Sequence, residues 1–166
     1  MARIKIDCEG GPIVIEADDD GVTVYGIDIE AERAAAALGF DPSPCLVAWD
    51  NALVDNARDG YVSVVELLLA AGADVHADGD YALQFAANRG HAGVVELLLA
   101  FGADVHADDE YALRSSSFTG YANVVELLLA VGANVHAKSD YALYWAADNG
   151  HADVVRILED WIEEHG

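Results

Sequence analysis

Positive charge is the scarcest property of this sequence. The 166 residues include 8 Lys and Arg against 30 Asp and Glu, which gives a formal net charge of −22. Because DNA, RNA and anionic lipid repel a polyanion, we expect no direct binding to nucleic acid or to a membrane. The same charge favours a partner with a basic surface, a salt-rich environment, or imitation of the charge of a nucleic acid.

Cysteines and long apolar runs are also scarce. The 2 cysteines, Cys8 and Cys45, match no metal-binding or redox spacing. We expect two reduced thiols, and a Cys8–Cys45 disulfide is the alternative. No stretch approaches the roughly 20 apolar residues of a membrane span, and the first residues contain no apolar signal segment. We therefore expect a soluble, intracellular, cytoplasmic protein, located in a host cell if its source is a virus.

Recognised catalytic patterns are missing from the sequence as well. No cysteine, serine or carboxylate lies in a known catalytic motif, and Gly10-Gly11 is a turn rather than a phosphate-binding loop. His76, His106 and His136 recur because the repeat described below places them, so we expect neither a metal nor another cofactor. We therefore do not expect the protein to be an enzyme. Catalysis by the N-terminal segment is the alternative, and that segment lacks a nucleophile–base pair.

What dominates the chain is a repeat of 30 residues. The segments 72–101, 102–131 and 132–166 align without gaps over their first 30 residues, each beginning with Gly-Ala. A degenerate copy, residues 50–71, precedes them. Units that share one core by stacking need atypical terminal copies, and the two outer copies are the irregular ones.

Each copy predicts two short helices. In the copy 72–101, the first is expected at about residues 80–89 and ends at Gly90, and the second is expected at about 92–101 and ends at Gly102. The second helix has an apolar stripe that it cannot bury alone, so neighbouring copies must stack. The stripe consists of Val94, Val95, Leu97, Leu98 and Leu99.

The segment Gly90–Val105, which reads GHAGVVELLLAFGADV, resembles the ankyrin signature, and the resemblance covers about residues 50–160. It implies a mainly α fold, a helical solenoid of about four repeats that binds a protein through its concave face. Tyr81-Ala82-Leu83-Gln84 replaces the family's Thr-Pro-Leu-His, and the unit is shorter than the usual length of about 33 residues. The missing residues precede Tyr81, where the family projects a hairpin finger. Similar short-finger repeats are abundant in large DNA viruses and some bacteria.

Residues 1–40 do not repeat, and they predict a small β-meander followed by a helix. Strand patterns occupy residues 3–8, 12–17 and 22–25, and a helix is expected at 28–37. With a linker at 41–49, this piece is too small to be stable alone, so we expect it to dock on the first repeat as a cap. The alternative is a module whose open strand edges pair with a target or with a second copy in a homodimer.

Positions that vary between copies are the candidate binding positions, because constant leucines such as Leu83, Leu113 and Leu143 predict the core. In ankyrin proteins the matching variable columns line the concave face. We add the Ser-rich segment 114–118 to these candidates, because its hydroxyls replace packed alanines without an evident gain in stability. Arg114 and Phe118 would form one patch with Tyr144 and Trp145, although Phe118 and Trp145 have core roles as alternatives. The candidate partner-binding residues are Arg58, Asn88, Arg89, Phe101, Arg114, Ser115, Phe118, Thr119, Tyr144, Asp148 and Asn149.

Acidic residues recur at the start of each copy and predict a negative edge along the solenoid. This edge would attract surfaces rich in Lys and Arg, and the alternative is a solvated face without a partner. Its members are Asp74, Asp78, Asp80, Asp104, Asp108, Asp109, Glu110 and Asp140.

The function expected from these features is non-enzymatic binding of a protein partner with a basic surface. One alternative is an inhibitor encoded by a virus or mobile element, which blocks a DNA- or RNA-binding protein by imitating nucleic-acid charge. A second alternative is an ankyrin scaffold adapted to a salty cytoplasm.

Overall fold

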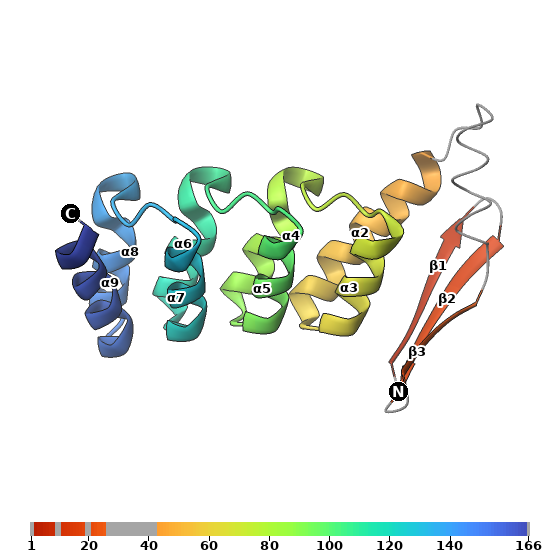
Figure 1. The fold of residues 1–166 in the computed structure, drawn as a ribbon, viewed down its shortest axis with the longest axis horizontal. Coiled ribbons are helices and arrows are strands. Elements are labelled where there is room, and N and C mark those ends of the chain that lie inside the picture. The colour runs from red at the N-terminus through yellow and green to blue at the C-terminus, as the bar shows by residue number, and fades with distance from the viewer. Residues whose placement is uncertain (1, 9–10, 19–20, 26–42, 166) are drawn as a thin grey trace.

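The computed structural model describes residues 2–8, 11–18, 21–25 and 43–165 (Figure 1). Three strands come first, β1 (Ala2–Cys8), β2 (Gly11–Asp18) and β3 (Gly21–Tyr25). They form an antiparallel sheet in the order β1-β2-β3, in which Ile15 of β2 lies opposite Ile4 of β1 and Val24 of β3. The helix expected at 28–37 lies outside the described residues, as do the side chains of Cys8 and Cys45.

Paired helices fill the rest of the described chain and stack in two layers (Figure 1). The first layer contains the first helix of each pair, and the second layer contains the second helix, each packed on its counterpart in the next pair. The first layer is α2 (Ser43–Asp59), α4 (Ala77–Asn88), α6 (Ala107–Thr119) and α8 (Ala137–Asp148). The second layer is α3 (Val62–Ala71), α5 (Ala92–Ala100), α7 (Ala122–Ala130) and α9 (Ala152–His165). This arrangement is the predicted helical solenoid.

The sheet lies at the α2–α3 end of this stack (Figure 1). Strand β1 packs beside α2, and strand β2 lies beside α3. Helix α2 begins at Ser43, so residues 43–49 are helical and the expectation of a linker over 41–49 is wrong for this part. Pro44 is compatible with this start, because the first turn of a helix has backbone N–H groups without intrahelical partners and tolerates proline.

The core runs through the whole stack and consists of residues from the constant columns of the repeat. Leu68, Leu98, Leu128 and Leu158 occupy equivalent positions, and each is fully or almost fully buried. The paired valines of α3, α5 and α7 are buried in the same way. Since equivalent helices pack on each other, each repeat covers the apolar face of its neighbour, as the resemblance implies. Among the described residues, the structure has no helix long and apolar enough to span a membrane.

In three repeats, the first helix begins with a left-handed turn. The sequence instead predicted an ordinary helix start at Asp80. Three consecutive residues have positive φ in each case, over residues 78–80, 108–110 and 138–140. Left-handed backbone costs L-residues about 1–2 kcal/mol each, so neighbouring groups must hold this turn. The side chain of Gln84 does so in one repeat, where its Nε2 donates a hydrogen bond of 2.8 Å to the carbonyl of Gly79.

Candidate partner-binding site

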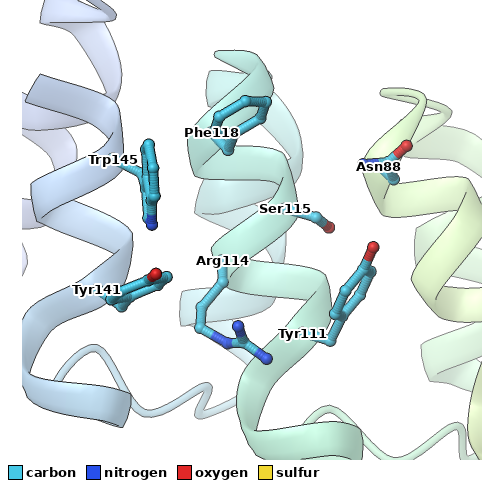
Figure 2. A pocket seen from close by; sticks show the side chains of 7 residues that line it. All are labelled: Asn88, Tyr111, Arg114, Ser115, Phe118, Tyr141 and Trp145. Carbon is cyan, nitrogen blue, oxygen red and sulfur yellow. The ribbon is translucent and has the colours of Figure 1, made fainter. Parts of the chain in front are cut away.

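A surface pocket of about 260 Å³ crosses three neighbouring helices of the first layer, α4, α6 and α8. Figure 2 shows that the central helix, α6, contributes most of its side chains. We call this site the aromatic pocket, and it is lined by Asn88, Tyr111, Arg114, Ser115, Phe118, Tyr141 and Trp145.

Aromatic rings form the α8 side of the aromatic pocket. Phe118 and Trp145 meet edge to face, with ring centroids 5.4 Å apart, and Tyr141 meets Trp145 in the same way at 5.6 Å (Figure 2). Edge-to-face pairs stabilise ring orientation beyond the area they bury. Phe118 nevertheless leaves 46% of its surface exposed. The aromatic pocket therefore offers rigid apolar surface that a partner's side chain can cover.

Arg114 supplies the positive charge of the aromatic pocket, and its own turn holds it in place. Its Nε donates to the carbonyl of Asp109 and its Nη2 donates to the carbonyl of Asp108, both at 2.8 Å. The guanidinium carbon lies 5.6 Å from the centroid of the Tyr111 ring, a distance typical of cation–π contacts. Arg114 thus stabilises the left-handed turn, as Gln84 does one repeat earlier, and also lines the aromatic pocket.

The serines of α6 have mostly internal partners. Ser115 is buried and donates a bond of 3.2 Å to the carbonyl of Ala112, so it lines the aromatic pocket from beneath rather than as an exposed contact. Ser116 donates to the same carbonyl at 2.8 Å. The hydroxyl of Ser117 is fully buried and has no hydrogen-bond partner among the described residues. The hydroxyls of Ser115 and Ser116 thus bond a carbonyl of the preceding turn, whereas that of Ser117 does not.

Comparison with protein families decides the class of this chain. A family model described as ankyrin repeats, in three copies, matches residues 53–139. The chain belongs to the ankyrin repeat family. A search among curated proteins finds no match. Ankyrin repeats indicate a module for protein–protein interaction, and proteins built from them are generally interaction scaffolds rather than enzymes.

The structure brings four of the predicted partner-binding residues of this ankyrin chain together in the aromatic pocket, namely Asn88, Arg114, Ser115 and Phe118. Tyr144 lies next to them, 58% exposed, with its ring 5.4 Å from that of Trp145. Asn149, Asp148, Arg89 and Phe101 are exposed but do not line the pocket.

Two further candidate partner-binding residues of these ankyrin repeats, Arg58 and Thr119, form contacts with neighbouring residues of their own helices. Arg58 forms ion pairs with Asp55, at 2.8 Å, and with Asp59, at 3.6 Å. The hydroxyl of Thr119 donates a bond of 2.8 Å to the carbonyl of Ser115 within α6. Neither residue lines the aromatic pocket.

Two members of the predicted acidic edge are buried, and their assignment to an exposed stripe is wrong. Asp80 is 5% exposed and Glu110 is 4% exposed. Burial of a carboxylate requires partners, and Asp80 Oδ1 accepts a bond of 2.8 Å from the backbone N–H of Asp104 in the next repeat. Asp50 accepts a bond of 2.7 Å from the N–H of Asp74 in the same way. This acidic column joins one repeat to the next.

The other members of the acidic edge have exposed side chains, although two of them also shape turns. Asp74 and Asp104 accept bonds of 2.9 Å from the backbone N–H groups of His76 and His106, two residues later. Asp78, Asp108, Asp109 and Asp140 are exposed. Asp109 forms an ion pair of 3.3 Å with Lys138 of the next repeat.

Histidines pair with acids at each left-handed turn of the ankyrin repeats. The Nδ1 atom of His76 lies 3.1 Å from Asp80, and the corresponding atoms of His106 and His136 contact Glu110 and Asp140. The hydrogen bond to Glu110 raises the pKa of His106, the charges of Glu110 and Asp104 act in the same direction, and burial opposes them. No group of three or more metal-ligating side chains occurs among the described residues.

Tyr111 and Tyr141 line the aromatic pocket but were absent from the sequence-based set. They belong to a column with Tyr81 that is identical in three repeats, and constancy predicted a structural role. The signal that identifies this column is exposure, since Tyr81 and Tyr141 remain 45% and 39% exposed and Tyr111 is half-buried, whereas core residues are buried.

Proposed function

We propose that this ankyrin chain binds a protein partner with a basic surface through the face formed by α4, α6 and α8, centred on the aromatic pocket. The observation that carries the proposal is the cluster of Phe118, Trp145 and Tyr141 around an open pocket. Aromatic anchors in pockets contribute most of the affinity in many protein interfaces. This face is the concave one according to the family resemblance.

Charge supports the basic character of the partner. The chain has a net charge of −22, and acidic side chains flank the aromatic pocket at both ends of α8, where Asp140 and Asp148 are exposed. Asp108 and Asp109 are exposed on the turn that Arg114 contacts. Negative potential of this kind accelerates association with Lys- and Arg-rich surfaces at low salt.

The N-terminal segment has a separate role in this proposal, as the cap of the first repeat. Among the described residues, the first helix pair, α2 and α3, packs on a neighbouring helix pair, α4 and α5, on one side. Strands β1 and β2 lie against the other side, which supports a capping role for the sheet.

Imitation of a nucleic acid is the alternative that the charge suggests. Imitation requires acids concentrated on one face. The exposed acids of the described repeats instead occupy both the turns, as at Asp108, and the second-layer helices, as at Glu96 and Glu126. This distribution favours a partner recognised through the aromatic pocket, with charge as an additional attraction.

A pull-down with the full chain as bait tests the proposal. The wild-type chain and the Phe118→Ala variant are incubated with lysate of the source cells at low and at high salt. Phe118→Ala is expected to lose the captured protein, whereas Tyr61→Ala, which removes a comparably exposed ring outside the aromatic pocket, retains it. Capture that is identical with both variants contradicts binding at this face.

A further inference from the structure

Aromatic rings recur at the same position on three successive helices of the face that holds the aromatic pocket. Tyr81 of α4, Tyr111 of α6 and Tyr141 of α8 are separated by one repeat each. Packed helices lie about 8–10 Å apart, so the backbone positions that carry these rings form a series with about that spacing. A polyproline II segment rises about 3.1 Å per residue, or about 9.3 Å per three-residue turn. Every third residue of such a segment therefore meets the next helix of the stack.

Hydrogen-bonding groups around the aromatic pocket also favour a polyproline II segment as its occupant. The Trp145 indole is a donor only, the Arg114 guanidinium has N–H groups beyond the two that bond Asp108 and Asp109, and the phenols of Tyr111 and Tyr141 are able to donate. Proline has a carbonyl acceptor but no N–H, and a polyproline II segment makes no internal hydrogen bonds. Its carbonyls are therefore available to a surface rich in donors, and few N–H groups are left without acceptors.

Two other backbone conformations fit less well. A helix satisfies its carbonyls internally and has a diameter of about 10–12 Å with side chains, so a pocket of 260 Å³ admits only its side chains. A β-strand presents N–H groups as well as carbonyls, and it therefore needs acceptors as much as donors.

We propose that the aromatic pocket binds an extended, proline-rich segment of the partner that is flanked by Lys or Arg. The inference rests on the proposed function and specifies the part of the partner that is recognised. Proline rings pack on the faces of the aromatic side chains, as in other grooves that bind polyproline II segments. The basic flanks are placed near Asp108, Asp140 and Asp148, which are exposed around the pocket.

Selection from a random 12-residue peptide display library on the immobilised full chain tests this inference. Binders that also bind the Tyr111→Leu/Tyr141→Leu double variant are discarded, so only those that need the aromatic pocket remain. The expected peptides contain prolines three residues apart and at least one Lys or Arg next to them. Circular dichroism of the double variant verifies that its helices are retained.

The strongest selected peptide is then synthesised and titrated with the chain by fluorescence anisotropy. Its dissociation constant is expected to rise at least tenfold with the double variant, and to stay unchanged with Tyr61→Leu, a matched loss of an exposed ring elsewhere. Replacement of the two prolines of the peptide by alanine is expected to weaken binding at least tenfold.

Selected peptides that lack proline, or that show apolar residues at helical spacing, overturn the proline-rich inference. If those peptides still depend on Tyr111 and Tyr141, binding at the aromatic pocket stands and only the chemistry of the occupant is wrong. A selection without any peptide that depends on the two tyrosines overturns the inference. The pull-down with Phe118→Ala then decides separately whether this face binds a protein at all.

Discussion

The side chain of Ser117 is fully buried, and its hydroxyl has no hydrogen-bond partner among the described residues. The preceding repeat has the equally buried Ala87 at this position. A buried hydroxyl without a partner costs about 1–3 kcal/mol, and serine is a weaker helix former than alanine by roughly 0.5 kcal/mol. We expect Ser117→Ala to raise the free energy of unfolding by about 1 kcal/mol or more. Urea denaturation followed by circular dichroism measures the change.

Ser116→Ala is the matched control for this substitution. The hydroxyl of Ser116 donates to the carbonyls of Ala112 and Leu113, at 2.8 and 3.1 Å, so its removal loses contacts that Ser117 does not make. We expect Ser116→Ala to gain less stability than Ser117→Ala. A destabilised Ser117→Ala variant would mean that this hydroxyl has a partner or contributes to packing.

His106 owes its raised pKa first to the hydrogen bond with Glu110. An NMR titration of the His106 ring should therefore have its midpoint above the usual value of about 6.5. Replacing the carboxylate with an amide, as in Glu110→Gln, removes the negative charge and should lower this midpoint. A midpoint that is unchanged by Glu110→Gln contradicts the assignment.

The same pair makes stability depend on pH in a defined direction. A histidine whose pKa is higher in the folded than in the unfolded state adds stability that is fully present below the unfolded value of about 6.5. This contribution is lost as the pH rises through the folded pKa. The advantage of the wild-type chain over His106→Gln in urea denaturation should therefore be larger at pH 5.5 than at pH 8.5. If the advantage of the wild-type chain grows with pH, the pKa of His106 is lowered rather than raised by folding, and the prediction is wrong.

At the scale of elements, the glycine between the two helices of a repeat fixes how closely the next repeat approaches. Gly90 and Gly150 occupy this position with φ values of +77° and +78°. A Cβ atom built on Gly90 would overlap the ring of Tyr121 in the next repeat, whereas one built on Gly150 meets nothing within 4 Å. The two glycines therefore share a backbone requirement but differ in packing.

Alanine at these two positions separates the effects of backbone and packing. Both variants should lose about 1 kcal/mol because the left-handed conformation disfavours alanine. Gly90→Ala should lose about 1–3 kcal/mol more, which is the usual cost of overpacking. Urea denaturation measures both variants, and Tyr121→Ala in the Gly90→Ala background should recover the difference. Equal losses in the two single variants would contradict close packing between the repeats.

The elements themselves were predictable because hydrophobic periodicity and glycine positions determine them. The apolar stripe of α5 and the glycines at 90 and 102 placed its ends to within one residue. The left-handed turns were not predictable, since Asp, Glu, Lys and Ser at positive φ have no distinctive sequence pattern. Contacts between neighbouring residues hold these turns, and such contacts become visible only in three dimensions.

The candidate site was predictable in part for a related reason. Variation between repeats identified Phe118, because surface positions are free to change, and the Ser-rich segment 114–118 identified Arg114. The rule of variation missed Tyr141, which is constant yet exposed, and the recurrence of acids placed the buried Glu110 on an exposed edge. Charge alone does not reveal burial when a carboxylate has a hydrogen-bonding partner such as His106.

At the scale of the whole molecule, the sequence contains 30 acidic residues, and the described repeats share a continuous aliphatic core. Exposed acids lie on turns and on second-layer helices alike, as at Asp108 and Glu126, so mutual repulsion acts over much of the surface. Repulsion of this kind is weakened by dissolved ions, because the Debye length falls from about 10 Å at 0.1 M to about 3 Å at 1 M.

We therefore expect NaCl to raise the urea midpoint of unfolding between about 0.05 and 0.5 M and to have little effect above about 1 M, where screening is nearly complete. The core residues of the stack are buried aliphatic side chains whose packing needs no salt. Sodium sulfate serves as the comparison, because it strengthens apolar burial and should continue to stabilise the chain at higher concentrations. A midpoint that rises steeply with NaCl beyond 1 M would instead mean that the acidic surface is an adaptation to a salty cytoplasm. In that case its charge would no longer support a basic partner, and the aromatic pocket alone would support binding.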